Sequence, residues 1–422
     1  MVSDELWVGV DYQPAATGPF LWQAFNIRAV DSDLAAIAAA GFRLARVGLA
    51  WDSFMPDARG VSRRRLAELD LLLRSAQAHG LRLILALFVQ AHGDCVFLPG
   101  RTVVRGRARS HVRVMSEGLL ELGQPRDPWT DPLMLELAER WSSTMAAEFG
   151  GHPAVAAWDL GEDPATVARP RRIADLPAWA ELAGRPFRER GDMVRLTLGV
   201  DDVCSARGLR LATLAPHLDA VDIALRVDGL RHLELRDASI PLFIAQLAQR
   251  LASDSSATPL GLTDASSPTP VGVAIAVPSG EAAPSDPVED ETPARNGGMD
   301  DERAAAVVDE LSARHADAGV ASLRAIRWSD LEPRLGERPP FDRAPWLLRS
   351  GLVRTGGEAK PALQSWSRMA AAELEQPQPR PWPPRLDTEA FYASVPESLL
   401  DLAKSWRDEH EDRPAILDHG EA

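Results

Sequence analysis

The chain has 422 residues, of which 45% are apolar, and its 46 basic and 61 acidic residues give a formal charge of −15. This apolar share is ordinary for a globular protein and excludes disorder of the whole chain. The acidic balance disfavours nucleic acid as a partner, because a protein that binds nucleic acid normally presents a basic face.

The N-terminal residues 1–7 are acidic and lack the basic and apolar regions of a secretory signal. No apolar run reaches the ~18 residues that cross a membrane. We therefore expect a cytoplasmic protein with no membrane partner. Two cysteines, Cys95 and Cys204, lie far apart in the sequence, so neither a disulfide framework nor a cysteine-type zinc site is expected.

Apolar runs in the first half of the chain alternate with helical patterns that start at polar caps and end at glycines. Apolar strands separated by helices are typical of a parallel sheet that is covered on both faces. The expected strands are residues 6–12, 42–51, 81–89 and 155–160. The expected helices begin at Asp31, Ser62 and Asp131 and end at Gly41, at Gly80 and near Gly150.

In the second half of the chain, apolar runs again alternate with helical patterns, but the patterns are weaker. Eight strand–helix units close naturally into a (β/α)8 TIM barrel, an α/β fold that a chain of this length can form with loop insertions. An open doubly wound sheet is the alternative, but it would need a glycine-rich phosphate loop after an early strand, and the sequence has none there. The expected strands are residues 209–214, 221–227, 259–263 and 321–328, and the expected helices are residues 240–251, 300–318 and 360–374.

The domain organisation follows from the stretches outside these repeats. We expect one barrel domain over residues 1–374, in which the Pro-rich residues 265–298 form a flexible insertion. Residues 375–422 are expected to form a Pro-rich linker, a helix that packs on the barrel and a disordered end. The apolar residues of that helix are Phe391, Tyr392, Leu399, Leu400 and Trp406.

Functional residues of a (β/α)8 barrel lie in the loops that follow the carboxyl ends of the strands. Carboxylates are concentrated there, which points to acid–base chemistry on an uncharged substrate. Structural roles are the alternative: a helix cap for Asp163, a turn for Asp264, pairing with buried carboxylates for Arg46, and core packing for the tryptophans. The spacing of acidic residues and histidine matches no metal motif. The selected residues are Tyr12, Gln13, Arg46, Trp51, His92, Glu162, Asp163, Asp264, Trp328 and Asp330.

Several segments resemble the cellulase-like β/α-barrel glycoside hydrolases of clan A. Residues 152–161, which read His-Pro-Ala-Val-Ala-Ala-Trp-Asp-Leu-Gly, are similar to the approach to the acid/base residue on the fourth strand of that family. The order and spacing of the segments carry the resemblance, which runs from about residue 6 to 407. The other matching segments are residues 8–14, 46–51, 54–56, 351–354 and 360–363.

The resemblance implies a protein that hydrolyses or binds β-linked glycosides, such as glucosides or mannosides, with carbohydrate as its partner and without a cofactor or metal. It assigns the acid/base position to Asp163 and the nucleophile position to Asp264, with Glu162 beside the former. The family has Asn-Glu-Pro and Glu-Phe-Gly at these places, whereas this chain has Glu-Asp-Pro at 162–164 and Asp-Ala-Ser at 264–266. The substrate-binding residues that it implies are Tyr12, Arg46, Trp51, His92, Trp328 and Asp330.

Both catalytic glutamates of the family are thus aspartates in this chain. Each replacement withdraws a carboxylate by roughly 1–1.5 Å. The gap between the two carboxyl groups therefore widens from the retaining distance of about 5–5.5 Å toward the inverting range of about 6.5–9.5 Å. One hypothesis is that Glu162 or Asp163 protonates the leaving oxygen while Asp264 activates water. The alternative is a catalytically inactive pseudo-glycosidase that acts as a carbohydrate-binding or interaction scaffold.

Two arginines, Arg226 and Arg327, neighbour the positions at which the family has a histidine and a tryptophan. We predict that at least one of them forms a salt bridge to a site carboxylate, as a plugged barrel would require. The sequence does not indicate which sugar, which linkage or which oligomeric state is involved.

Overall fold

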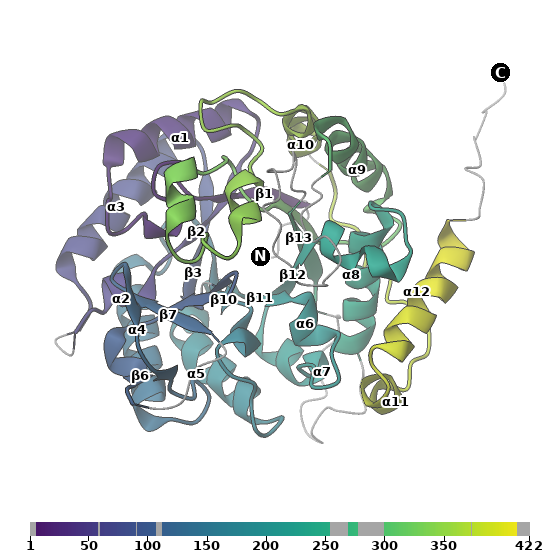
Figure 1. Cartoon of the computed structure of the whole chain (residues 1–422), viewed down its shortest axis with the longest axis horizontal. Helices are drawn as coiled ribbons and strands as arrows, with labels where there is room; N and C mark the ends of the chain where they lie inside the picture. The colour runs from purple at the N-terminus through teal and green to yellow at the C-terminus, as the bar shows by residue number, and fades with distance from the viewer. Residues whose placement is uncertain are drawn as a thin grey trace.

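The computed structural model of the chain describes residues 6–57, 60–89, 91–106, 112–253, 269–276, 299–372 and 374–411. Eight parallel strands close into a barrel (Figure 1), in which the strands pair in chain order and β14 completes the ring against β1. The barrel strands are β1 (Trp7–Tyr12), β2 (Leu44–Gly48), β3 (Arg82–Val89), β10 (Val155–Glu162), β11 (Val194–Gly199), β12 (Ala220–Arg226), β13 (Val271–Ala276) and β14 (Ser322–Ala325). The predicted (β/α)8 barrel is therefore confirmed.

Helices surround the barrel and cover the outer faces of its strands (Figure 1). Ser62 and Asp131 cap their helices as predicted, because each side chain accepts a hydrogen bond from a backbone amide of the first turn. Asn26 caps the first helix, which therefore begins before Asp31. The main helices are α1 (Ile27–Ala39), α3 (Arg63–Ala78), α4 (Pro132–Phe149), α5 (Asp175–Arg188), α7 (Leu211–Leu214), α8 (Ser239–Ala252), α9 (Asp301–Arg314) and α10 (Pro361–Ala371).

Two barrel strands lie elsewhere than the sequence patterns predicted. The fifth is β11, whereas the apolar run 209–214 contains the short helix α7. Arg195 and Thr197 are polar and interrupt the apolar pattern of β11. The barrel interior accommodates them because their side chains form hydrogen bonds there. The seventh is β13, which falls within residues 265–298, so that this segment is not an uninterrupted insertion. The strand expected at 259–263 lies outside the described residues.

The segment after β3 forms part of the barrel mouth, the face made by the carboxyl ends of the strands and their loops. It contains a four-stranded sheet in the order β4-β5-β7-β8 and a two-stranded sheet of β6 and β9. These strands are β4 (Ala91–His92), β5 (Cys95–Phe97), β6 (Val103–Val104), β7 (Arg113–Ser116), β8 (Leu119–Glu121) and β9 (Gln124–Pro125).

A buried carboxyl group connects this sheet to the barrel. Asp52, in the short helix α2 (Trp51–Phe54), is fully buried, and its Oδ2 accepts a hydrogen bond of 2.6 Å from the backbone amide of Glu117. Burial raises the pKa of Asp52 to about 7, although the amides of Glu117 and Ser53 oppose the shift. Because the folded-state pKa exceeds the unfolded one, this group stabilises the fold below about pH 4, and the contribution is lost as the pH rises through about 7.

We expect Asp52→Asn to remove this pH dependence, because an amide does not ionise. The free energy of unfolding of the wild type relative to D52N should be highest at about pH 4 and lowest at about pH 8. Denaturant titrations across this range measure the difference. Asp70→Asn, which alters an exposed ion pair with Arg74, serves as the control. A difference for D52N that stays flat or rises with pH would contradict the assignment.

The C-terminal tail returns to the barrel through α11 (Thr388–Ala393) and α12 (Glu397–His410), which lies beside α8 (Figure 1). Trp406 is buried, and its Nε1 donates a hydrogen bond of 2.7 Å to Gln246 Oε1 of α8. Leu400 remains 40% exposed, on the outer side of α12. Residues 412–422 lie outside the described part of the chain. None of the described helices is long and apolar enough to cross a membrane.

Candidate functional site at the barrel mouth

A cavity of about 270 Å³ opens at the barrel mouth, close to the lower size limit of small-molecule sites. Of the residues selected from the sequence, it is lined by Tyr12, Gln13, Arg46, His92, Glu162 and Asp163. Its remaining wall includes Asp11, Arg226, Ala276, Arg327 and Trp346. The barrel therefore brings together part of the predicted site, from β1, β2, β10 and the loop after β3.

The predicted tryptophans do not line this cavity. Trp51 packs edge-on against Phe88, with ring centroids 5.2 Å apart. Trp328 packs edge-on against Phe42, with centroids 6.3 Å apart. Both are almost fully buried, so the core-packing alternative describes their placement.

Neither Asp330 nor Asp264 is among the described residues that line the cavity. Asp330 Oδ1 forms a buried ion pair of 2.8 Å with Lys360 Nζ and accepts a hydrogen bond of 2.9 Å from the amide of Gly351. These contacts fix the loop that follows β14. Asp264, the expected nucleophile or base, lies outside the described residues.

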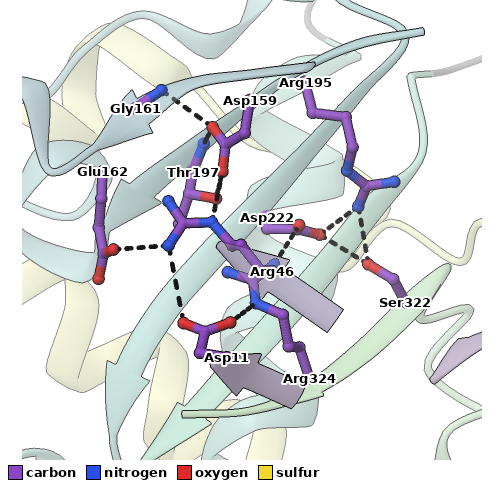
Figure 2. A network of polar contacts seen from close by, with 10 residues as sticks. All are labelled: Asp11, Arg46, Asp159, Gly161, Glu162, Arg195, Thr197, Asp222, Ser322 and Arg324. Atoms are coloured by element: carbon purple, nitrogen blue, oxygen red, sulfur yellow. Dashed lines mark hydrogen bonds and ion pairs between the residues drawn. The ribbon is translucent and has the colours of Figure 1, made fainter. Parts of the chain in front are cut away.

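Glu162, at the end of β10, is held by an ion pair. Its Oε2 lies 2.9 Å from Arg46 Nη1, and Arg46 Nε lies 2.7 Å from Asp159 Oδ2 (Figure 2). Arg46 Nη1 also lies 3.7 Å from Asp11 Oδ2, because β1 and β2 place these two residues side by side. Burial alone would lower the pKa of Arg46, but the three carboxylates raise it above its usual value. Glu162 is thus the counterion of a permanently charged arginine.

Asp163 follows directly and has a different environment. Its backbone is left-handed (φ +46°), and its side chain makes no cap hydrogen bond to the short helix η3 (Pro164–Thr166). The carboxyl group lies over Gly199, where a β-carbon would collide with Oδ1. That Oδ1 is buried and has no hydrogen-bond partner among the described residues. The helix-cap alternative therefore does not account for the Asp163 side chain.

The environment of Asp163 favours the protonated form of its carboxyl group. Burial raises the pKa of its carboxyl well above the ordinary 3.8, and the nearby charges of Asp202, Glu162 and Asp201 raise it further. Arg46 opposes the shift only in part. A protonated carboxyl at the end of β10 can donate a hydrogen bond or a proton to a ligand oxygen.

His92 adds an uncharged ring to the cavity. Burial lowers the pKa of His92 to about 3, and the positive charges of Arg327 and Arg46 act in the same direction. Its Nε2 lies 3.4 Å from Gln13 Nε2, and its ring rests edge-on against Phe97. A neutral imidazole and an amide at this place can exchange hydrogen bonds with hydroxyl groups.

The predicted salt bridge of Arg226 or Arg327 to Glu162 or Asp163 is not formed, so that prediction was wrong for the described acids. Arg226 pairs instead with Asp228, and its guanidinium lies 3.5 Å from the ring centroid of Trp346. Arg327 donates a hydrogen bond to the carbonyl of Leu347. Both arginines line the cavity without filling it.

Arg327 adds a positive charge to the cavity wall, and Trp346 adds an aromatic ring. Burial lowers the pKa of Arg327 to about 10, against the opposing charges of Asp11, Asp330 and Glu162, so it remains a cation at neutral pH. Trp346, from the short helix η8 (Pro345–Arg349), is the aromatic residue of the cavity wall that the sequence analysis missed. It lies in a loop without periodic pattern, so no signal distinguished it from Trp328.

The seventh strand contributes no carboxylate to the cavity along its described length. β13 reads Val-Gly-Val-Ala-Ile-Ala and ends at Ala276 in the cavity wall. The carboxylates of the wall come from β1, β10 and the residue after β10. Within the described residues, no cluster of three or more histidine, cysteine or acidic side chains could hold a metal ion.

Behind Arg46, ion pairs continue through the barrel interior (Figure 2). Arg324 of β14 bridges Asp11 and Asp222, and its Nη1 lies 2.8 Å from Asp222 Oδ2. Asp222 Oδ1 accepts hydrogen bonds of 2.6 Å from Arg195 Nη2 and from Ser322 Oγ. Arginines and carboxylates therefore alternate from Glu162 at the mouth to Asp222 deep in the barrel.

This interior network depends on close packing of the strands. Burial would raise the pKa of Asp222, but Arg195 and Arg324 outweigh it and hold the pKa well below 3.8. Gly272 of β13 leaves the necessary room, since a β-carbon there would overlap Ser322 Oγ and Asp222 Oδ1. Apart from the suggested pairing of Arg46, the network was not predicted from the sequence, because an arginine in a short strand does not reveal which face it occupies.

No family model and no curated protein matches the sequence. An exo-β-1,4-mannosidase from Opitutaceae bacterium strain TAV5 is similar in structure, with a TM-score of 0.64 and 19% sequence identity. The match covers 87% of this chain but 60% of that enzyme, so the chain spans less than two thirds of its length.

Two GH5_18 proteins match over more of their length. The protein from Streptomyces cattleya, crystallised as a glutamate-to-alanine variant with Manβ1-4GlcNAc, has a TM-score of 0.71 and 18% identity over 97% of this chain and 92% of that one. The protein from Bifidobacterium longum subsp. longum ATCC 55813 has a TM-score of 0.68 and 18% identity over 89% and 81%. At these identities the similarity establishes the fold. The chain therefore shares the (β/α)8 barrel fold of these GH5_18 proteins.

Proposed function

We propose that this glycoside-hydrolase-like barrel binds a β-linked glycoside at its mouth without cleaving it, and in particular that it forms no glycosyl-enzyme intermediate. The proposal rests on which carboxyl groups of the cavity are ion-paired and which one has a pKa raised well above its ordinary value. Asp11 and Glu162 are ion-paired with buried arginines, and the pKa of Asp163 is raised well above 3.8. Double displacement needs an ionised nucleophile about 5–5.5 Å from a protonated acid. The described wall supplies the acid and no free nucleophile.

The remaining groups of the wall suit a neutral sugar. A pyranose presents hydroxyl groups that exchange hydrogen bonds and an apolar face that an aromatic ring can cover. The neutral His92 and Gln13 can serve the hydroxyls, and protonated Asp163 can donate to a ring or glycosidic oxygen. Trp346, oriented by Arg226, offers the aromatic surface. Manβ1-4GlcNAc is the first ligand to test, because a GH5_18 protein of the same fold was crystallised with it.

We expect His92→Ala to weaken binding of Manβ1-4GlcNAc about tenfold, which corresponds to the loss of about 1.4 kcal/mol in hydrogen bonding. Isothermal titration of the wild type and the variant measures the change. His232→Ala removes an exposed histidine outside the cavity and should bind like the wild type. Equal affinities for the wild type and H92A, or no binding by the wild type at millimolar protein and ligand, would count against the proposed site.

An inverting hydrolase is a second candidate, and the raised pKa of Asp163 favours it. In that mechanism Asp163 would protonate the leaving oxygen while a carboxylate from outside the described residues activates water. Its signature is slow release of sugar with inverted anomeric configuration, abolished by Asp163→Asn. Nuclear magnetic resonance of the first-formed anomer distinguishes it from binding alone.

A further inference from the structure

A second cavity, of about 490 Å³, lies outside the barrel mouth and is larger than the cavity described above. It lies between the loop after β10 and the segment from α6 (Val200–Val203) to α7, and shares no lining residue with the mouth. Its wall contains four arginines and no acidic residue: Arg169, Arg171, Arg207 and Arg210. Such a concentration of positive charge is notable in a chain of net charge −15.

Arg169 connects parts of this wall through hydrogen bonds and forms no ion pair with any residue that the structure describes. Its Nη1 donates hydrogen bonds of 2.7 Å to the carbonyl of Arg207 and 3.1 Å to Ser205 Oγ, and its Nη2 donates one of 3.3 Å to the carbonyl of Asp201. These acceptors are uncharged. Its charge lowers the pKa of Asp202, but burial still raises that pKa to about 7, so Asp202 offsets the charge only in part.

The other arginines are available to a ligand. Arg207 is exposed and forms no ion pair within the described part of the chain. Arg171 is 83% exposed and lies 3.7 Å from Asp127, a weak contact that a ligand can replace. Arg210 is fixed over the ring of Tyr392, with the guanidinium carbon 3.6 Å from the centroid.

Arg210 also carries an unused donor. Its Nε is buried and has no hydrogen-bond partner among the residues described, although its Nη2 contacts the exposed Glu389 at 3.4 Å. A buried N–H group without a partner costs free energy, which an added acceptor would recover. The cavity therefore combines one guanidinium that is fixed by packing with more mobile cations at its edge.

We propose that this cavity binds a small organic phosphate. Guanidinium groups match the oxygens of a phosphate through paired, charge-assisted hydrogen bonds, and several arginines can share one phosphate. The wall also contains Leu176, Leu209 and Leu214, together with Ile173, which is 57% exposed. The three leucines are almost fully buried, so the exposed Ile173 provides the contact for an apolar body attached to the phosphate. The site is independent of the proposed glycoside binding.

Isothermal titration with phenyl phosphate and inorganic phosphate tests the proposal. The double variant Arg171→Gln/Arg207→Gln removes two charges from the cavity, and both side chains are exposed, so the fold should persist. Arg28→Gln/Arg64→Gln removes the same charge from exposed positions elsewhere. We expect phenyl phosphate to bind the wild type and the control double variant alike, at least about 30-fold more tightly than R171Q/R207Q, with an affinity that falls as salt is added.

Three outcomes would overturn the proposal. One is the absence of phenyl phosphate binding by the wild type at about 10 mM, which would be weaker than a specific site requires. Another is equal affinity of R171Q/R207Q and R28Q/R64Q, which would assign binding to general charge. The third is inorganic phosphate that binds as tightly as phenyl phosphate, because the apolar wall would then play no part.

Discussion

Asp222→Asn is expected to lower the free energy of unfolding by about 3–5 kcal/mol at neutral pH. The substitution preserves the size of the side chain but removes the charge that compensates Arg195 and Arg324, both almost fully buried. Arg324 would keep Asp11, but Arg195 would lose the counterion with which it pairs among the described residues. A buried arginine without a counterion has lost its solvation without a replacement. Denaturant unfolding followed by circular dichroism measures the loss.

The exposed pair of Asp70 and Arg74 provides the matched comparison. Its nitrogen–oxygen distance is 2.9 Å, similar to that of the Arg324–Asp222 pair, but both side chains are more than a third exposed. Asp70→Asn should therefore cost no more than about 1 kcal/mol. A cost for D222N as small as that of D70N would mean that the interior network contributes little to stability.

Arg46→Gln has the second largest expected effect and links stability to ligand binding. Without the guanidinium, Asp11, Asp159 and Glu162 lose a shared counterion, so the free energy of unfolding should fall by about 3 kcal/mol or more. The side chain of Glu162, at the end of β10, would no longer be held by an ion pair. We expect the affinity for Manβ1-4GlcNAc to fall at least tenfold, because a site displaced by about 1 Å loses its hydrogen bonds.

Arg65→Gln is the control for that variant, since Arg65 also forms an ion pair, with Glu68, but on the outer helix α3. It should leave the affinity unchanged and cost about 0.5 kcal/mol of stability. Unfolding and isothermal titration are measured on both variants. If R46Q bound the disaccharide as the wild type does, the ion pair would have no part in shaping the cavity.

The sequence predicted the fold best where strands contain an uninterrupted apolar run, as at residues 83–88 and 155–158. β3 and β10 are covered on both faces, so their continuous apolar runs identified them. β11 was missed because Arg195 and Thr197 face the barrel interior, where polar side chains are satisfied by Asp222 and Asp159. The burial that stabilises those pairs arises only when the barrel closes.

The sequence predicted where the site residues lie, but only part of how their side chains interact. The order of segments placed Glu162 and Asp163 at the end of β10, and Arg46 pairs with the buried Asp159, as its structural alternative expected. Which acid is ion-paired and which has a raised pKa depends on contacts between strands distant in sequence. The same applies to Trp346, whose place beside Arg226 is set by the loop after β14.

The most direct test of the account is to record nuclear magnetic resonance spectra of Manβ1-4GlcNAc during long incubation with the protein. We predict saturation transfer from the protein to the disaccharide, which reports binding, and no appearance of free mannose. Release of mannose that persists in the wild type and is abolished in Asp163→Asn would contradict the claim of binding without cleavage. Absence of saturation transfer would contradict the claim of binding.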